Sequence, residues 1–149
     1  MASKVILIED SRMLVQCLKL LLAPADVVAV SDLATAEALV RSASPTDTVM
    51  VDLKLPDSAP LATLCRIAAW KKRKDAPRVV VITGTKDQRI IDAAREGPAD
   101  AVAVKNGEGF FAALRDLGLV PKPQRDCGQC SENVERIEKE VGELVGVGG

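Results

Sequence analysis

The stretch VMVDLKLPD, residues 49–57, joins a run of apolar residues to an acid and, a few residues later, to a proline. Val49 to Val51 have the apolar character of a buried strand, Asp52 follows at once, and Pro56 cannot take part in a strand ladder. A charged carboxylate at the end of a buried strand is poorly solvated unless a nearby group stabilises it. The stretch therefore predicts a strand that delivers Asp52 to a polar site.

Similar apolar runs of strand length recur along the chain. They cover VILI at 5–8, VVAV at 27–30, TVMV at 48–51, VVVIT at 79–83 and AVAV at 101–104. Longer segments in which apolar residues return every three or four positions separate these runs, as with Leu14, Leu18 and Leu21. This alternation predicts an α/β fold with a doubly wound, five-stranded parallel sheet that helices cover on both faces.

The composition narrows the classes of function. The 149 residues suffice for one domain with one core, and 20 basic against 21 acidic residues argue against binding to nucleic acid or to an anionic membrane. No apolar run approaches the roughly 18 residues of a membrane span, and no signal-peptide pattern is present, so we expect a cytoplasmic protein. The chain has no histidine, so any chemistry must use carboxylates, hydroxyls, lysine or thiols.

Polar residues stand at the carboxyl ends of four predicted strands, the edge where open parallel sheets bind ligands. They are Glu9 and Asp10, Asp52, Thr83 and Lys105. Two ionised acids about 4 Å apart repel by roughly 4 kcal/mol at an effective dielectric constant near 20. Either raised pKa values or a small hard cation must relieve this repulsion, and oxygen ligands at an open site suit Mg²⁺.

Such a site can support phosphoryl transfer. With Mg²⁺ bound, Asp52 could attack a phosphoryl donor in line and form an acyl phosphate. The hydroxyl of Thr83 and the ammonium group of Lys105 fit as partners for the phosphoryl oxygens.

The stretches VILIEDSRMLV, VMVDLKLPD, VVVITGT and AVAVKN, in this order and at these intervals, resemble the receiver domain of two-component response regulators, the CheY-like superfamily. The resemblance covers about residues 4–118. It implies a flavodoxin-like (βα)5 fold with strand order 2-1-3-4-5 and a histidine kinase or phosphotransfer protein as phosphodonor. It also implies the following roles: Asp52 as phosphoacceptor, Glu9, Asp10 and Asp52 as Mg²⁺ ligands, Thr83 as switch hydroxyl and Lys105 as phosphate-binding lysine.

The sequence departs from the receiver pattern beside the lysine. Val102 stands where receivers usually carry an aromatic residue that moves with the threonine, and Asn106 stands where a proline usually follows the lysine. The usual coupling of phosphorylation to output is therefore in question. Lys54 faces the path of a hydrolytic water in the family, so it could change the dephosphorylation rate, or it could simply face solvent.

The C-terminal part divides into two further segments after the predicted receiver domain at 1–118. Residues 119–130 form a predicted linker with Cys127 and Cys130, and residues 131–149 contain a predicted amphipathic helix. Because Cys17 and Cys65 fall near apolar helix faces, we expect them to be buried, which leaves the Cys127–Cys130 pair as inert thiols, a redox pair or half of a zinc site shared by two chains. The helix needs a partner surface, which could be its own receiver, a second copy in a homodimer, or a target; a free, disordered tail is the alternative.

The residues together predict a stand-alone receiver protein that is phosphorylated on Asp52 and acts by changing its protein contacts, rather than an enzyme. Two other classes remain open. A pseudo-receiver would use the fold as a phosphorylation-independent binding module, which the changes at Val102 and Asn106 favour and the complete set of acids, threonine and lysine disfavours. A phosphotransfer or hydrolase enzyme acting on a separate substrate is disfavoured by the lack of histidine.

Overall fold

The computed structural model describes residues 4–23 and 25–120, in which strands and helices alternate from β1 to α5. The strands are β1 (Lys4–Ile8), β2 (Asp26–Val30), β3 (Thr48–Asp52), β4 (Arg78–Thr83) and β5 (Ala101–Val104). The helices are α1 (Arg12–Leu22), α2 (Leu33–Arg41), α3 (Pro60–Lys71), α4 (Gln88–Glu96) and α5 (Glu108–Asp116). Each predicted strand is confirmed to within one residue at either end.

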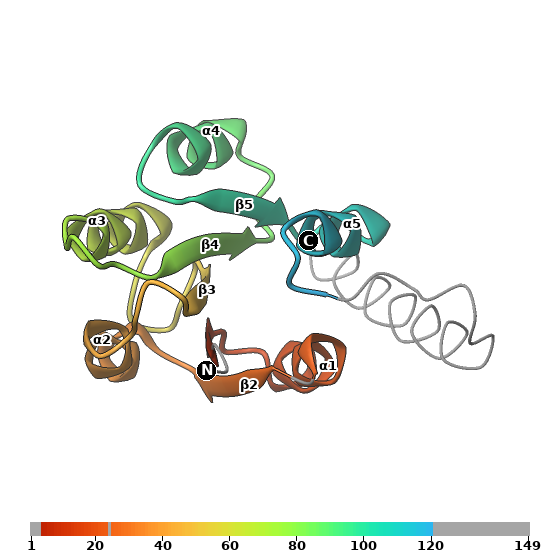
Figure 1. Cartoon of the computed structure of the whole chain (residues 1–149). Coiled ribbons are helices and arrows are strands. Elements are labelled where there is room, and N and C mark those ends of the chain that lie inside the picture. The colour runs from red at the N-terminus through yellow and green to blue at the C-terminus, as the bar shows by residue number, and fades with distance from the viewer. Residues whose placement is uncertain (1–3, 24, 121–149) are drawn as a thin grey trace.

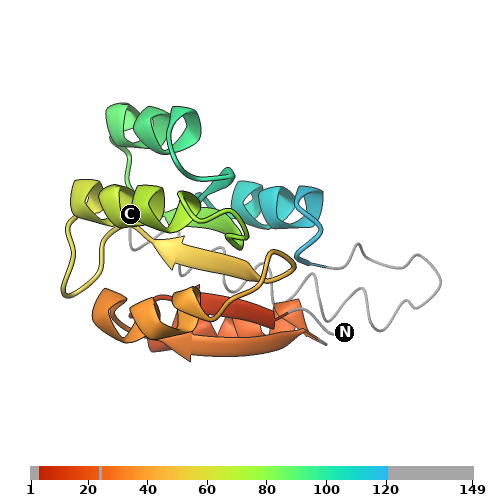
Figure 2. The same cartoon turned by 60° about the vertical axis from the view of Figure 1, so that its left-hand side comes forward.

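The five strands form one parallel sheet in the order β2-β1-β3-β4-β5, which confirms the predicted fold class. The arrows of β2 and β3 point the same way in Figure 2. The chain runs outward from β1 to β2 and then crosses back to β3 on the other side of β1. Strand order therefore reverses between β1 and β3, the place where parallel sheets open a ligand-binding crevice.

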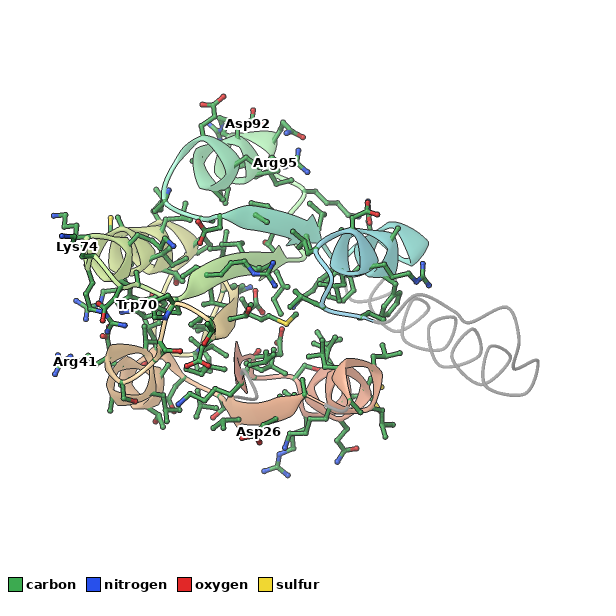
Figure 3. All side chains as sticks on the ribbon, in the orientation of Figure 1. Asp26, Arg41, Trp70, Lys74, Asp92 and Arg95 are labelled. Atoms are coloured by element: carbon green, nitrogen blue, oxygen red, sulfur yellow. The ribbon has the colours of Figure 1, made fainter. Side chains whose placement is uncertain are left out.

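Helices cover both faces of the sheet (Figure 1). On one face, α1 and α5 bury a layer that includes Leu18, Phe110 and Phe111. The rings of Phe110 and Phe111 meet edge to face, with their centroids 5.2 Å apart. On the other face, α2, α3 and α4 bury a layer that includes Ile67 and Trp70. Trp70 lies between α2 and α3 (Figure 3), and its indole Nε1 donates to a carboxylate oxygen of Glu37 on α2 at 3.1 Å.

The described chain ends against the α1 and α5 face. The backbone N–H groups of Leu119 and Val120 both donate to the carbonyl of Leu114, and Val120 is buried in the same apolar layer. The predicted linker with its cysteine pair and the predicted C-terminal helix lie outside the described residues. None of the described helices is long and apolar enough to cross a membrane.

Candidate functional site

The candidate site is a cavity of about 810 Å³ at the carboxyl ends of the central strands. The loops that follow β1, β3, β4 and β5 supply its polar walls, and α1 supplies an apolar wall. Its lining includes six residues that the sequence analysis predicted for the site: Glu9, Asp10, Asp52, Lys54, Thr83 and Lys105. These residues are far apart in the chain and meet here because parallel strands end at one edge.

The three acids lie close enough to share one cation. Glu9, Asp10 and Asp52 can each offer one carboxylate oxygen so that all three atoms lie within 4.8 Å of one another. Glu9 and Asp52 are buried, whereas Asp10 is exposed. Two buried ligands and one that faces water form an open oxygen site of the kind that holds a divalent metal with water in its remaining positions.

Lys105 stands between the two buried acids. Its Nζ atom lies 2.7 Å from a carboxylate oxygen of Glu9 and 3.1 Å from one of Asp52. Its backbone N–H donates to the carbonyl of Thr83 at 2.7 Å, which holds the start of the loop after β5 against the end of β4. One cation thus serves two buried carboxylates.

This sharing shifts the protonation of the site. Burial raises the pKa of Glu9 most, Lys105 lowers it and Asp52 raises it again, with a result of about 7. For Lys105, burial lowers the pKa, but the charges of Asp52 and Glu9 outweigh it and raise the pKa above its usual value. Because its raised pKa favours the protonated form of Glu9, a divalent cation that binds here would compete with a proton.

The remaining nominated residues occupy three different settings. Thr83 ends β4 with a buried side chain, and its Oγ1 accepts from the backbone N–H of Thr85 at 3.1 Å. Lys54 is exposed at the cavity edge, and its backbone N–H donates to Asp52 at 3.3 Å. Val102 lies in β5 away from the cavity lining, half-buried against the apolar layer under α2, α3 and α4.

Asp57 is a residue near the site that the sequence analysis missed. Its two carboxylate oxygens accept from the backbone N–H groups of Leu33 and Ala34, at 2.9 and 3.0 Å, at the start of α2. These two hydrogen bonds lower the pKa of Asp57. Because Asp57 lies on the loop that follows Asp52, it ties that loop, and Lys54 with it, to the N-terminus of α2.

The cysteines differ in part from expectation. Cys17 is half-buried and lines the cavity, but Cys65 is exposed, so the prediction that it is buried is wrong. The buried side of α3 includes Thr63, whose hydroxyl donates to the carbonyl of Leu53 at 2.8 Å. A polar residue with a satisfied hydroxyl takes an inward position, and Cys65 lies on another side of the helix. Cys127 and Cys130 lie outside the described residues.

The fold and the site define a class of protein: a doubly wound α/β domain with a lysine and three acids at its strand ends, in which the acids could hold a metal ion. No protein-family model matches the chain, and no curated protein matches it. Many solved receiver domains do match its structure.

Three of these structures illustrate the similarity. The phosphorylated cyanobacterial phytochrome response regulator RcpA is 20% identical, with a TM-score of 0.61 over 97% of this chain and 94% of its own. A response regulator receiver domain from Rhodospirillum rubrum is 26% identical, with a TM-score of 0.61 over 81% and 99%. The Mn²⁺-bound form of a further response regulator is 19% identical, with a TM-score of 0.63 over 82% and 99%. The chain therefore has the fold of response regulator receiver domains, as its sequence motifs predicted.

Proposed function

We propose that this chain is a phosphoacceptor receiver protein of a two-component or phosphorelay signalling system, phosphorylated on Asp52 in a Mg²⁺-dependent reaction. One observation carries the proposal. The buried carboxylate of Asp52 lies within 4.8 Å of carboxylate oxygens of Glu9 and Asp10 and 3.1 Å from the Nζ atom of Lys105. A nucleophile, a cation site and a fixed positive charge thus share one cavity.

The residues divide the proposed chemistry among them. Glu9, Asp10 and Asp52 would hold Mg²⁺, which supplies positive charge to the phosphoryl oxygens. A carboxylate oxygen of Asp52 attacks phosphorus; the new bond joins that oxygen to phosphorus, and the bond to the donor breaks with its electron pair leaving on the donor. The ammonium group of Lys105 and the hydroxyl of Thr83 would bind the phosphoryl oxygens.

Output would come from altered protein contacts and not from turnover of a separate substrate. A histidine kinase or a phosphotransfer protein is the proposed donor, since structural neighbours include the receiver domain of a signal transduction histidine kinase from Syntrophus aciditrophicus. We propose a cytoplasmic location, with the receiver domain at residues 1–118 followed by the linker and the C-terminal helix. The downstream target is a protein whose contacts with the receiver surface change on phosphorylation.

A second candidate function rests on Val102. A half-buried valine offers no ring that could move toward the space beside Thr83, so the fold could instead serve as a phosphorylation-independent binding module. The two candidates differ in whether Asp52 accepts a phosphoryl group. Lys54, exposed at the cavity edge, would adjust the lifetime of that group in the first candidate and have no such role in the second.

The intact mass of the protein after incubation with acetyl phosphate and Mg²⁺ tests the proposal. We expect one added phosphoryl group in the wild type, none in Asp52→Asn, and none without Mg²⁺. Asp47→Asn is the matched control because Asp47 is an equally buried acid just before the same strand, and this variant should still gain the group. If the wild type gains no phosphoryl group from either acetyl phosphate or a phosphohistidine donor, the phosphoacceptor function is rejected. The phosphorylation-independent binding module is then the function that fits.

A further inference from the structure

Thr63 is a buried polar residue that the proposed chemistry does not use. It lies on the inward side of α3, which also holds Leu64, Ile67 and Trp70, and it is fully buried. It does not line the cavity that holds Asp52. A hydroxyl group in an apolar layer is unfavourable unless it is hydrogen-bonded, so the partners of Thr63 indicate what the residue does there.

The hydroxyl of Thr63 has three polar neighbours and only one proton to donate. Its Oγ1 atom lies 2.8 Å from the carbonyl oxygen of Leu53, 3.0 Å from that of Ala59 and 2.8 Å from Oγ of Ser58. The carbonyl of Ala59 already accepts from the backbone N–H of Thr63 at 2.9 Å. The geometry therefore favours donation from Thr63 to the nearer carbonyl, that of Leu53, and Ser58 then donates to Thr63.

The hydrogen bond to Leu53 also sets the direction of the next backbone N–H group. The carbonyl of Leu53 and the N–H of Lys54 belong to one planar peptide group, and in a trans peptide they point in opposite directions. This N–H donates to the Oδ1 atom of Asp52 at 3.3 Å. By holding the carbonyl on the α3 side, Thr63 keeps the N–H of Lys54 directed at the carboxylate of Asp52.

The other carboxylate oxygen of Asp52 has a different donor. Its Oδ2 atom lies 3.1 Å from the Nζ atom of Lys105. With one donor on each oxygen, the carboxylate cannot rotate about its Cβ–Cγ bond without losing a hydrogen bond. In-line attack on phosphorus depends on the orientation of this group, and a misplacement of about 1 Å can slow such a reaction about 100-fold.

We propose that Thr63 is a positioning residue for phosphoryl transfer: its hydroxyl fixes the peptide group between Leu53 and Lys54, and this group orients the carboxylate of Asp52. The inference rests on the proposed function and adds to it a residue of α3 that lies outside the cavity.

The rate of phosphorylation by acetyl phosphate and Mg²⁺, followed by intact mass, tests the proposal. Thr63→Val removes the hydroxyl and keeps the shape of the side chain, so we expect phosphorylation about tenfold slower than in the wild type. Thr63→Ser keeps the hydroxyl and should recover most of the rate. Thr48→Val is the matched control, because Thr48 is a buried threonine at the opposite end of β3, where its hydroxyl accepts from Arg78 at 3.4 Å. Its rate should equal that of the wild type.

Two further measurements separate positioning from a general loss of stability. Hydrogen exchange of the Lys54 amide reports on the peptide group without phosphorylation, and it should be faster in Thr63→Val than in Thr63→Ser or Thr48→Val. Urea unfolding defines conditions under which every variant is folded. Ser58→Ala is a milder change at a half-buried position, and its phosphorylation rate should lie between those of the wild type and Thr63→Val.

The outcomes distinguish this inference from the proposed function. Wild-type phosphorylation rates in both Thr63→Val and Ser58→Ala, or unchanged exchange of the Lys54 amide in Thr63→Val, would overturn the inference and leave the proposed function intact. Equal slowing in Thr63→Val and Thr63→Ser would also overturn it, because the hydroxyl would then not be responsible. A wild type that gains no phosphoryl group would reject the proposed function, and the inference with it.

Discussion

Two buried acids at opposite ends of the sheet show how differently the fold uses the same chemical group. Asp47, just before β3, accepts from the backbone N–H groups of Lys4 and Ser44 at 3.1 and 2.9 Å. Glu9, just after β1, accepts from one backbone N–H, that of Ser11, and shares Lys105 with Asp52. Both side chains are less than one tenth exposed.

Their pKa values shift in opposite directions. Burial raises the pKa of Asp47, but the hydrogen bonds from Ser44 and Lys4 outweigh burial and lower it below its usual value. Burial dominates for Glu9, and the charge of Asp52 adds to it, so its pKa rises to about 7. An acid that accepts hydrogen bonds from neutral backbone N–H groups stabilises the fold in its ionised form. An acid that competes with another for one lysine is poised to take up a cation.

The largest effect should come from removing the shared lysine. Lys105→Met leaves Glu9 and Asp52 buried without a cation, and breaking such a buried pair costs on the order of 3 kcal/mol. The loss in the free energy of unfolding should be larger at pH 8 than at pH 5, because Glu9 is protonated at the lower pH. Urea unfolding without metal at the two pH values measures it. An equal loss at both would contradict the proposed competition.

Asp47→Asn should be the next largest in effect. The amide offers one acceptor oxygen to two N–H groups, so we expect a loss of about 1 to 2 kcal/mol at pH 7. Because the pKa of Asp47 is lowered on folding, its ionised form stabilises the protein above the unfolded-state pKa. The difference between wild type and variant should therefore shrink as the pH falls below about 4. A difference that stays constant down to pH 2 would assign the loss to packing instead.

Glu9→Gln should change the free energy of unfolding in the opposite direction to Asp47→Asn. Since the pKa of Glu9 is raised on folding, the folded protein binds the proton more tightly than the unfolded chain, and stability falls as the pH rises from about 4.5 to about 7. The neutral amide avoids that loss, so the metal-free variant should be more stable than the wild type at pH 8 by about 1 kcal/mol and no more stable at pH 5. Thermal unfolding in a chelator measures this. Destabilisation at both pH values would place Glu9 in the same class as Asp47.

Two acids cap the N-terminus of α2, and we expect them to differ in their effect on the lifetime of the acyl phosphate. Asp32 is the residue just before the helix, and it accepts from the backbone N–H of Thr35. Asp57 lies on the loop after β3 and accepts from the backbone N–H groups of Leu33 and Ala34. Alanine at either position should cost about 1 kcal/mol. Only Asp57→Ala should also change the lifetime of the acyl phosphate, because it releases the loop that carries Lys54. Equal acyl phosphate lifetimes in the two variants would mean that the contact between Asp57 and the start of α2 has no influence on the site.

The sequence predicted most of this arrangement for a physical reason. Strands buried on both faces are continuous apolar runs, and parallel strands end at one edge, so the polar residues that stop the runs, such as Asp52 and Thr83, could be placed together without coordinates. The hydrogen bonds from the start of α2 to Asp57 could not be predicted, because they join two segments that are more than 20 residues apart in the sequence and share no sequence pattern. The burial of Thr63 and the exposure of Cys65 were likewise missed because a tertiary hydrogen bond decided them.

The most direct measurement of the central claim is to locate the phosphoryl group on the chain. After reaction with acetyl phosphate and Mg²⁺, borohydride reduction converts a phosphorylated aspartate to homoserine, and peptide mass analysis then identifies the residue. The account predicts one modified position, Asp52, in the wild type and none in Asp52→Asn. Modification at Asp10 or Asp47 instead, or a modified Asp52 that forms equally well in a chelator, would contradict the site described for this chain.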